Sequence, residues 1–403
     1  MTLAVELHGT IVGTLEGDAR SFDFVPSAEG IERFGANSSV LSVAIPLLPL
    51  TRRDHAGRRR NWFGELLPEG IQYDYMLQQG GLRPGDTLGF LARYGRDVAG
   101  AVQVWDPDDP TEPPAPTIKP VTRAEVRGLL EDPIGSPLAN TPGSGRSSLG
   151  GVQPKVVLTR TREGWAQALG GYPSTHILKP QLAGNNASMI FDEEYGSRIA
   201  HTLGLADFAT HVEDFDGLAA LVIERYDRVG EQRVHQEDFN QALGASGNEK
   251  YQEPRGVVSL QRVADTLTRH CPQEDLVRFA QMVIMAVAIG NLDMHTKNIG
   301  LLHPADGSVR LTPAYDVVPQ AHLSNDGRLA LAVNRKYRLL DVTADDLLEE
   351  FTSWGLKRAA ATVGETLERL KGVVMDEAPL DQAFPALQEQ ILSFISRLRT
   401  GSS

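Results

Sequence analysis

The sequence predicts an α+β fold in which a mixed N-terminal domain is followed by a small, strand-rich lobe and a larger, mainly helical lobe. Three observations predict this division. Strand-like patterns recur before residue 225, an acidic, proline-rich segment interrupts them at 106–116, and helical periodicity dominates from about Glu237 onward. With 403 residues and 41% hydrophobic content, the chain can form two or three folding units of roughly 100–200 residues. We assign the N-terminal domain to 1–105, a proline-rich linker to 106–121, the small lobe to 122–226 and the large lobe to 227–403, with the N-terminal domain packed on the small lobe.

Composition restricts the compartment and the kinds of partner. The single cysteine, Cys271, excludes an internal disulfide and a multi-thiolate metal site within one chain, so the expected location is cytoplasmic and a metal needs oxygen ligands. Residues 1–6 lack the basic flank and apolar core of a signal peptide, and no stretch approaches the ~20 apolar residues of a membrane span. The net charge of −13 repels nucleic-acid phosphates, so we expect neither a membrane nor DNA as a direct partner.

One segment departs from this acidic balance. Five arginines and a histidine gather within nine residues, namely Arg52, Arg53, Arg58, Arg59, Arg60 and His55. Such a cluster suits a phosphate, an acidic partner or a substrate surface, but it is more often a solvated loop between strands. The sequence leaves both interpretations open.

The N-terminal domain is expected to combine a small sheet with helices. Residues 3–13 alternate around the turn pair His8-Gly9, and 39–45 form a second run rich in β-branched and apolar residues, so both are predicted as strands. A mostly helical region follows from Trp62 to about Arg96. The domain ends at 106–116, where prolines and acids disfavour both helix and sheet and leave an extended linker.

The small lobe is predicted to begin with a short helix and to continue as strands. A Gly/Ser-rich loop at 141–151 runs directly into a strand at 155–159, and its composition permits positive φ and close approach of the backbone to a ligand. Further strands are expected at 165–169, 175–179 and 219–223, with one helix at 122–131 and another at 191–203 that ends at Gly204.

The most informative segment is 290–300, which follows the strongly apolar helix predicted at 273–289. It places Asp293 five positions before Asn298, the spacing of a kinase catalytic loop in which Asp accepts the proton of the attacking hydroxyl and Asn holds Mg²⁺. Asp316 follows a predicted short hairpin, at the expected end of a strand, and is suited to hold the same metal from the other side. Each residue alone is also typical of a helix cap or a turn.

Upstream residues supply a matching nucleotide site. The glycine loop at 150–153 is suited to cradle phosphates, although a flexible linker has a similar composition. Lys179 ends an apolar strand, where a lysine either extends to solvent or directs its ammonium to the α- and β-phosphates of a nucleotide. Glu193 or Glu194 in the next helix is placed to pair with it, and the sequence does not decide between them.

The order of the parts is more specific than any one of them. Residues 224–226 follow a strand, where their backbone would meet an adenine edge as the chain crosses between lobes, or would form an ordinary strand end. His295 either lines the site or holds the loop as a core histidine, and Lys297 adds a cation beside the transferred phosphate. A glycine loop, a strand lysine, an acidic helix, a hinge, an Asp-x4-Asn loop and a later Asp follow one another as in a protein kinase. We therefore expect a two-lobed, protein-kinase-like fold and phosphoryl transfer from ATP.

These motifs resemble those of the HipA-type serine/threonine kinase toxins of bacterial toxin–antitoxin systems. Ser147–Lys155 is similar to the family's Ser-x-x-Gly-x-Gln-Pro-Lys loop, and Ile223–Arg228 to its hinge. Asn291–Asn298 and Tyr315-Asp316 resemble its catalytic and metal motifs, and Trp62–Gly70 resembles the signature of its N-terminal domain. The resemblance covers nearly the whole chain.

The resemblance implies a serine/threonine protein kinase that uses ATP and Mg²⁺, with Asp293 as catalytic base and with Asn298 and Asp316 on the metal. It implies nucleotide contacts from Gly150, Gly151, Val152, Gln153, Lys179, Glu224, Tyr226, His295 and Tyr315. It also implies inactivating autophosphorylation of the glycine loop at Ser148 or Ser147, because a dianionic group there would compete with ATP for the same donors. The implied partners are a HipB-type helix-turn-helix antitoxin, through which alone the protein reaches DNA, and an aminoacyl-tRNA synthetase as protein substrate.

Two other functions stay open on the sequence. A small-molecule or lipid kinase of the same fold is one, because the run Asp-x-His-x-x-Asn also occurs in such kinases. A nucleotide-binding co-repressor that acts through a DNA-binding partner without turnover is the other. Phosphoserine or phosphothreonine on a discrete protein would distinguish the protein kinase from the first, and ATP turnover would exclude the second as a sufficient account.

Overall fold

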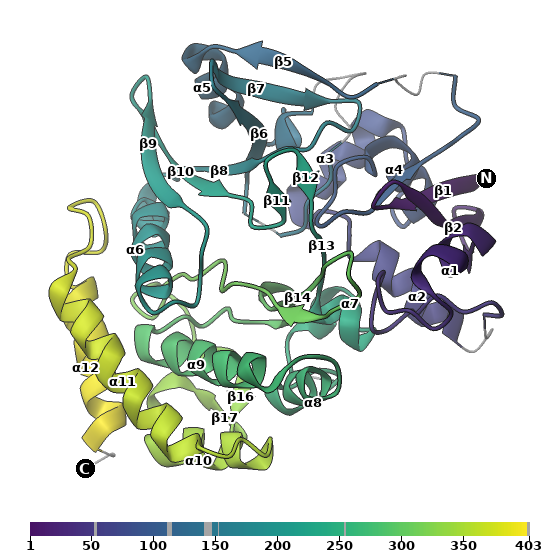
Figure 1. The fold of residues 1–403 in the computed structure, drawn as a ribbon. Coiled ribbons are helices and arrows are strands. Elements are labelled where there is room, and N and C mark those ends of the chain that lie inside the picture. The colour runs from purple at the N-terminus through teal and green to yellow at the C-terminus, as the bar shows by residue number, and fades with distance from the viewer. Residues whose placement is uncertain (52–54, 111–114, 141–146, 152, 254, 401–403) are drawn as a thin grey trace.

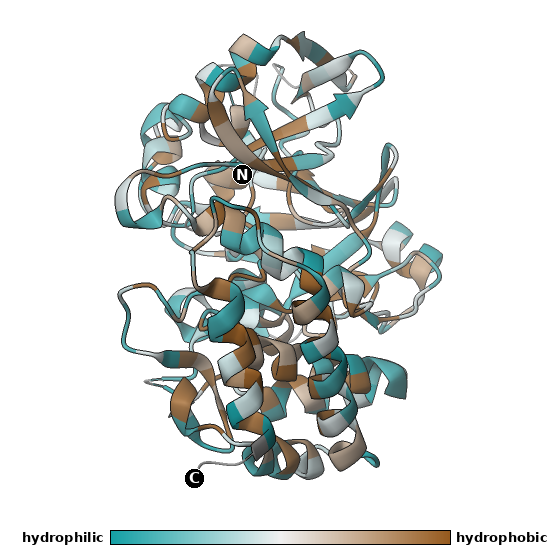
Figure 2. Cartoon of the chain, turned by 90° about the vertical axis from the view of Figure 1, so that its left-hand side faces the viewer, coloured by the Kyte–Doolittle hydropathy of each residue, from teal (hydrophilic) through white to brown (hydrophobic). Residues whose placement is uncertain are grey.

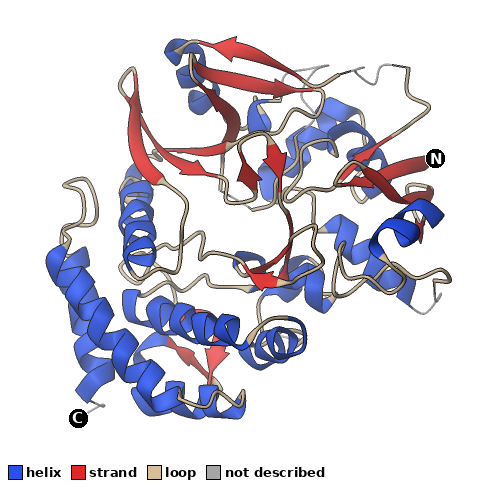
Figure 3. Ribbon diagram, in the orientation of Figure 1, coloured by secondary structure: helices blue, strands red, loops and turns tan. Residues whose placement is uncertain are grey.

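The computed structural model describes residues 1–403 apart from 52–54, 111–114, 141–146, 152, 254 and 401–403. Its chain forms an N-terminal domain, a small lobe and a large lobe, which follow one another from purple to yellow in Figure 1. Figure 3 shows the large sheet in the upper part of the molecule and most long helices below it. The predicted α+β class and the two lobes are confirmed. Val152 of the glycine loop and Arg52 and Arg53 of the basic cluster lie outside the described residues.

The N-terminal domain is built on a four-stranded antiparallel sheet with the order β3-β2-β1-β4. His8 and Gly9 join the first two strands with positive φ values of 51° and 75°, as a tight hairpin requires. Because β4 pairs with β1, the end of the domain returns to its beginning. The elements are β1 (Thr2–Leu7), β2 (Thr10–Gly17), β3 (Phe22–Pro26), α1 (Ala28–Phe34), α2 (Ala56–Gly64), α3 (Gly70–Gly80), α4 (Thr87–Tyr94) and β4 (Gln103–Trp105).

The strand predicted at 39–45 is wrong. That segment is irregular, and its apolar side chains are mostly buried on all sides rather than on one face. Its polar groups bond the buried carboxylate of Glu237, to which the Val43 amide donates at 2.9 Å and the Ser42 hydroxyl at 2.5 Å. A side-chain carboxylate therefore satisfies groups that the sequence pattern assigned to a neighbouring strand.

The described arginines of the basic cluster lie on α2 and not on a loop. Arg59 is buried, and its guanidinium pairs with the carboxylate of Asp23 at 2.5 Å. Arg60 donates to the carbonyl of Phe22 at 3.4 Å. Both contacts hold α2 against β3, so these two arginines stabilise the domain and are neither a solvated loop nor a ligand patch.

The small lobe contains a six-stranded antiparallel sheet with the order β5-β7-β6-β8-β10-β9. β5 lies at 117–121, so five residues predicted as linker belong to the sheet. The predicted helix at 122–131 is confirmed as α5, which begins with a capping box formed by Thr122 and Glu125. The elements are β5 (Thr117–Val121), α5 (Arg123–Glu131), β6 (Val156–Thr161), β7 (Gly164–Leu169), β8 (His176–Pro180), α6 (Met189–Thr202), β9 (Thr210–Phe215) and β10 (Leu218–Glu224).

The large lobe is organised around α9, which spans Gln273–Ile289 as predicted. Twelve of its residues are buried, and it packs against α8, α11 and α12. It ends at Gly290, whose φ is 72° and whose added Cβ would lie 2.7 Å from the Cβ of Ala321, so only glycine fits this turn. The helices are α7 (Phe239–Leu243), α8 (Leu260–His270), α9, α10 (Ala344–Ser353), α11 (Ala359–Asp376) and α12 (Leu387–Thr400).

The large lobe also contains short strands, so the prediction of helix from Glu237 onward is incomplete. β13 pairs with β14, and β14 pairs with β15 in the hairpin predicted before Asp316. These strands are only two to six residues long, which is too short for a clear alternating pattern. They are β11 (Arg228–Val229), β12 (Gln232–Arg233), β13 (His235–Asp238), β14 (Gly300–His303), β15 (Arg310–Leu311), β16 (Arg328–Val333) and β17 (Lys336–Arg338).

The cores join the three parts to one another. Figure 2 shows hydrophobic stretches running through the helices of the large lobe and through the sheets above them. The apolar core of the N-terminal domain includes Leu138, Leu149 and Val157, which belong to the small lobe in sequence. The core of the large lobe includes α6 and Leu221 of β10. The N-terminal domain therefore packs on the small lobe, as predicted, and α6 connects the small lobe to the large one.

A buried ionic cluster ties the N-terminal domain to the segment between the lobes. Asp97 follows α4 and is almost fully buried. Its carboxylate lies 2.6 Å from Arg233 and 3.0 Å from Arg228, and 3.9 Å from Arg225. Arg225 in turn pairs with Asp227 at 2.8 Å. The buried carboxylates of Asp97 and Asp227 therefore offset the charge of the guanidinium groups beside them, which lowers the free-energy cost of burying all of these groups.

Candidate active site

The predicted catalytic loop, residues 291–298, is held by its own polar groups. The Asp293 amide donates to the side chain of Asn291 at 3.1 Å, and the Asn298 side chain donates to the Asp293 carbonyl at 3.0 Å. Tyr251 donates its hydroxyl to the Asp293 carboxylate at 3.2 Å. The helix cap is Gly290, so Asp293 is not the cap that the alternative interpretation assumed. The Asp293 carboxylate therefore does not cap the helix, and the residue lines a cavity that is described below.

Lys179 connects the small lobe to the predicted metal ligands. Its ammonium lies 2.7 Å from Glu193 and 2.5 Å from Asp316, and the side chain is buried instead of extending to solvent. The other oxygen of Asp316 accepts from the Asn298 amide at 3.1 Å. Lys179, Asp316 and Asn298 thus meet through direct contacts. Asp293 joins them through the loop that it shares with Asn298.

The structure decides between the two candidate acids of α6. Glu193 is fully buried and bonds Lys179, whereas Glu194 pairs with Arg198 one helical turn later, at 3.0 Å. Adjacent positions on a helix point about 100° apart, so only one of the two can face the lysine. Glu193 is that residue.

Asp316 occupies an irregular turn and not the end of a strand, so that detail of the prediction is wrong. Its φ of 54° lies in the left-handed region, which Asp adopts more readily than most residues. Burial alone would raise the pKa of Asp316, but the ion pair with Lys179 outweighs it and holds this pKa well below its ordinary value. Burial and the negative charge of Asp316 raise the pKa of Asp293 to about 6.

The glycine loop covers one side of a cavity of about 590 Å³ between the lobes. Gly150, Gly151 and Gln153 line it, together with Lys179, Asp293, Asn298 and Asp316. The φ of Gly151 is 100°, and a Cβ there would lie 2.5 Å from the ammonium of Lys155. The loop therefore needs glycine at this position.

Lys155 is a site residue that the sequence reasoning did not assign. Its ammonium donates to the Gly150 carbonyl at 2.6 Å and lines the same cavity. Burial and the nearby charge of Lys179 lower the pKa of Lys155 to about 8. Its position directly after Gln153-Pro154, in the motif quoted above, was the available signal.

Ser147 and Ser148 lie behind the loop. Both are buried, Ser148 completely, and its hydroxyl donates to the Leu66 carbonyl of the N-terminal domain at 2.8 Å. Ser147 contacts the carboxylate of Asp97 at 3.3 Å. In this arrangement neither serine is among the residues that line the cavity between the lobes.

The predicted hinge lines the opposite side of the same cavity. Glu224 and Tyr226 both contribute to it, and the Tyr226 ring lies 5.3 Å from that of Tyr315. The amides of Glu224 and Arg225 donate to the carbonyls of Ala209 and Thr175, each at 2.9 Å, so these two amides of the predicted hinge are already bonded. Burial raises the pKa of both tyrosines well above their ordinary value, which keeps them neutral.

His295 and Lys297 also line the cavity, with different surroundings. Burial, with the charge of Lys250, lowers the pKa of His295 to about 4, so the ring is neutral at pH 7. The ammonium of Lys297 lies 2.9 Å from Glu65 and 2.8 Å from Glu69. Lys297, predicted as a cation beside the transferred phosphate, is thus paired with two acids of the N-terminal domain that line the same cavity.

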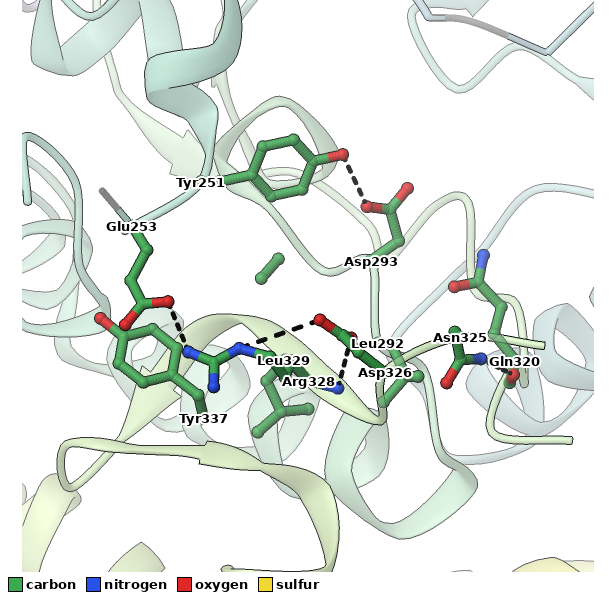
Figure 4. Close-up of a pocket in the computed structure, with 11 residues that line it drawn as sticks. Tyr251, Glu253, Leu292, Asp293, Gln320, Asn325, Asp326, Arg328, Leu329 and Tyr337 are labelled. Carbon is green, nitrogen blue, oxygen red and sulfur yellow. Dashed lines mark hydrogen bonds and ion pairs between the residues drawn. The ribbon is translucent and has the colours of Figure 1, made fainter. Parts of the chain in front are cut away.

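A second cavity, of about 290 Å³, is also lined by Asp293 (Figure 4). Tyr251, Asp293 and Gln320 line both cavities. The rest of its wall comes from the large lobe, where Arg328 pairs with Glu253 and where Tyr337 lies close by. Asp293 thus stands at the junction of a large cavity between the lobes and a smaller one in the large lobe.

The described residues contain no group of three or more His, Cys, Asp or Glu side chains suited to hold a metal ion. Asp316 and Asn298 would offer a cation two oxygen ligands, which suits Mg²⁺ that carries nucleotide phosphates and water. None of the helices in the described ranges combines the length and apolar character needed to cross a membrane.

A two-lobed α+β fold, with a buried Lys–Glu pair in the small lobe and an Asp-x4-Asn loop facing it, defines a kinase-like enzyme. The comparisons identify the family. A family model described as HipA-like C-terminal domain matches residues 147–375, and one described as HipA N-terminal domain matches residues 3–105. The chain belongs to the HipA family and is a kinase.

Individual relatives agree with this assignment. A protein of Sinorhizobium fredii is 32% identical over 328 residues, which cover 77% of this chain and 75% of that protein. The serine/threonine-protein kinase toxin HipA of Shewanella oneidensis is 27% identical over 423 residues, covering 99% of this chain and 94% of the relative. A solved complex of HipA, HipB and operator DNA from Shewanella oneidensis MR-1 contains a chain similar to this one over the full length of both, with a TM-score of 0.81 and 26% identity.

Proposed function

We propose that this kinase is a toxin that transfers the γ-phosphate of ATP to a serine or threonine hydroxyl of another protein. The observation that carries the proposal is the position of Asp293 at the junction of two cavities. The larger cavity suits the nucleotide, because the glycine loop and Lys179 line it. Because Asp293 also lines the smaller cavity, an acceptor hydroxyl bound there would lie beside the same residue.

Asp293 is the proposed base. A carboxylate whose pKa is about 6 is mostly ionised at neutral pH and still accepts a proton more readily than an ordinary aspartate. Tyr251 and the loop's own hydrogen bonds fix its orientation. Most of the rate then comes from positioning and charge neutralisation, because phosphoryl transfer asks for little covalent work from the protein.

Asp316 and Asn298 are the proposed Mg²⁺ ligands. Asp316 is ionised, and both of its oxygens already contact nitrogen groups, the ammonium of Lys179 and the amide of Asn298. Such a carboxylate suits a cation, and the Asn298 amide must rotate to present its oxygen to the same position. When bound, Mg²⁺ neutralises charge on the nucleotide phosphates. Lys179, released from Asp316 but retained by Glu193, is then placed to bind phosphate oxygens.

Autophosphorylation at Ser148, or at Ser147, is proposed as the inactivating modification. The support is burial, since the Ser148 hydroxyl is completely covered and bonded to the Leu66 carbonyl. A phosphate group on Ser148 would bring a dianion against a carbonyl oxygen, which is unfavourable in a buried position. The loop would have to leave its place to be modified and could not return afterwards, so the nucleotide cavity would lose one wall.

The proposed partners are a HipB-type antitoxin and, as substrate, an aminoacyl-tRNA synthetase, both in the cytoplasm. The similarity to the Shewanella chain that was solved with HipB and operator DNA supports the first. The acidic balance of this chain, −13 at pH 7, favours contact with DNA only through such a partner.

The proposal is tested by incubating a cell extract with labelled ATP and the purified enzyme, followed by phosphoprotein mass spectrometry. We expect phosphoserine or phosphothreonine on one or a few proteins, and none with the Asp293→Asn variant. Label that appears only in small molecules or lipids would contradict the protein acceptor and favour the alternative kinase. ATP binding without any turnover would favour a co-repressor.

A further inference from the structure

We propose that Glu65 and Glu69 of the N-terminal domain are positioning residues for the catalytic loop, so that the N-terminal domain is a working part of the kinase site. The inference rests on the proposed phosphoryl transfer at Asp293. The two acids lie in the motif Trp62–Gly70, to which none of the roles proposed above assigns a function.

The two carboxylates bracket the ammonium of Lys297 in the catalytic loop. Glu65 lies 2.9 Å from it and Glu69 lies 2.8 Å from it. The side chains of Lys297 and Glu65 are each 7% exposed. Lys297 directly precedes Asn298 and follows Asp293 by four residues, so the contact holds the end of the loop that carries the proposed metal ligand.

Glu69 reaches a second lysine that leads to the catalytic carboxylate by another route. It lies 2.8 Å from the ammonium of Lys250, which is also buried. The next residue, Tyr251, donates its hydroxyl to Asp293. The Lys250 carbonyl accepts the Thr296 hydroxyl at 3.1 Å, which ties this segment to the catalytic loop as well.

Glu65 has further contacts that lead to the same place. It accepts from the Gly247 amide at 2.7 Å and from the side chain of Asn240 at 3.1 Å. Asn240 then accepts the Thr296 hydroxyl at 2.9 Å. All three chains of contacts that start at the two acids therefore end within residues 293–297. This segment begins at the proposed base, Asp293, and directly precedes the proposed metal ligand, Asn298.

The supporting elements are rigid, which is what a positioning role needs. Glu65 follows the last residue of α2 and Glu69 precedes the first residue of α3, so their backbones are fixed by helix ends. Trp62 of α2 donates its indole N–H to Glu237 at 2.8 Å, and its carbonyl accepts from Gln241 at 3.0 Å. The N-terminal domain is thereby bound to the large lobe next to the catalytic loop.

Charge explains why the pair should matter for turnover. Removal of both carboxylates would remove the ion-pair partners of Lys297 and Lys250 and leave Lys297 only the charge of Asp238. Buried charges that lose their partners move or lose their burial. Because reacting groups tolerate little displacement, a shift of about 1 Å in the loop is enough to reduce the rate about 100-fold. Among the described residues, Lys179 pairs with Glu193 and Asp316 and not with these two acids.

The test compares Glu65→Gln, Glu69→Gln and the double variant with the wild type in the full-length protein. We expect kcat to fall about tenfold in each single variant and about 100-fold in the double variant. The dissociation constant for Mg²⁺–ATP, measured under non-turnover conditions, should stay within about twofold. Wild-type kcat in the folded double variant would overturn the inference.

Two controls separate positioning from general stability. Asp23→Asn removes a carboxylate that pairs with Arg59 inside the same domain, away from the catalytic loop. It should lower the melting temperature without changing kcat. Lys297→Met combined with Glu65→Gln should lower kcat no more than the worse single variant, because both remove one interaction. Additive losses, or an equal fall of kcat in Asp23→Asn, would show a merely structural role.

Failure of this inference is distinct from failure of the proposed function. If the wild type transfers no phosphate to any acceptor, the function itself is refuted. If the wild type is active and the Gln variants match it, only the positioning role is refuted.

Discussion

At the scale of residues, two carboxylates in one site have pKa values shifted in opposite directions. Burial and the charge of Asp316 raise the pKa of Asp293, whereas the ion pair with Lys179 keeps the pKa of Asp316 low. Such a separation is typical of sites in which one acid exchanges a proton and the other binds a cation. Lys179 is the residue on which the separation depends.

Replacement of Lys179 tests this dependence. Lys179→Met leaves the buried Glu193 and the half-buried Asp316 without their cation, so we expect a loss of about 3–5 kcal/mol in the free energy of unfolding. Mg²⁺–ATP affinity should fall together with stability. Lys119→Met is the matched control, because Lys119 is exposed on β5. Chemical denaturation and calorimetric titration measure the two effects, and unchanged ATP affinity in Lys179→Met would contradict the assigned role.

The sequence could predict residues that carry chemistry at a fixed local spacing. Asp293 and Asn298 lie five positions apart, and the structure brings them together with Asp316 and Lys179. It could not predict the partners of Lys297, because Glu65 lies 232 positions away and a contact across that distance leaves no periodic signal. The choice between Glu193 and Glu194 likewise required the orientation of α6.

At the scale of elements, long periodic segments were predictable and short or irregular ones were not. The helix predicted at 273–289 agrees with α9 at both ends, because an apolar run and a following glycine define it. The strand predicted at 39–45 failed because burial on all sides imitates the composition of a strand. The strands of the large lobe were missed because pairs as short as β11 and β12 have no readable period.

The connection between α4 and the hinge gives a prediction at this scale. Asp97→Asn removes the charge that balances Arg225, Arg228 and Arg233, so we expect a loss of about 3–5 kcal/mol in the free energy of unfolding. Asp106→Asn is the control, because Asp106 follows β4 on the partly exposed surface. Equal stability of the two variants would show that the cluster does not hold the domain to the hinge.

At the scale of the whole molecule, three parts share their cores and their charges. The core of the N-terminal domain reaches into the small lobe, and its acids reach into the large lobe. Local patterns predict the parts but not such interfaces, since each interface depends on residues far apart in the sequence. We therefore expect the ion pairs between the parts and the cores that they share to be lost together when the protein unfolds.

This coupling predicts how stability changes with pH. Burial opposes ionisation of Glu69 and Asp227, but their ion pairs lower both pKa values to about 2 in the folded protein, from 4.5 and 3.8. Groups with a depressed folded pKa contribute stability above their unfolded pKa and lose it as pH falls toward the folded value. Each contributes on the order of 2–3 kcal/mol.

Other carboxyls act in the opposite direction at higher pH. Burial raises the pKa of Asp238 to about 7 and that of Asp293 to about 6, so the folded state binds protons more tightly there. Burial also lowers the pKa of His295 and of His176 to about 4, so below about pH 6.5 the folded state binds protons less tightly at these rings. The two effects oppose each other between pH 7 and about 5, and stability should fall steeply below about pH 4.5, where the ion-paired carboxyls add to the loss. Urea unfolding at a series of pH values measures it, and a steady increase in stability down to pH 3 would contradict the assigned ion pairs.

The most direct test of the central claim is the rate of phosphoryl transfer from labelled ATP by the wild type and by Asp293→Asn, with Mg²⁺–ATP affinity measured on the same preparations. The account predicts a rate reduced by about 10²–10⁴-fold in the variant, with affinity nearly unchanged, because Asp293 accepts a proton and does not hold the nucleotide. Phosphoryl transfer by Asp293→Asn at the wild-type rate would contradict it.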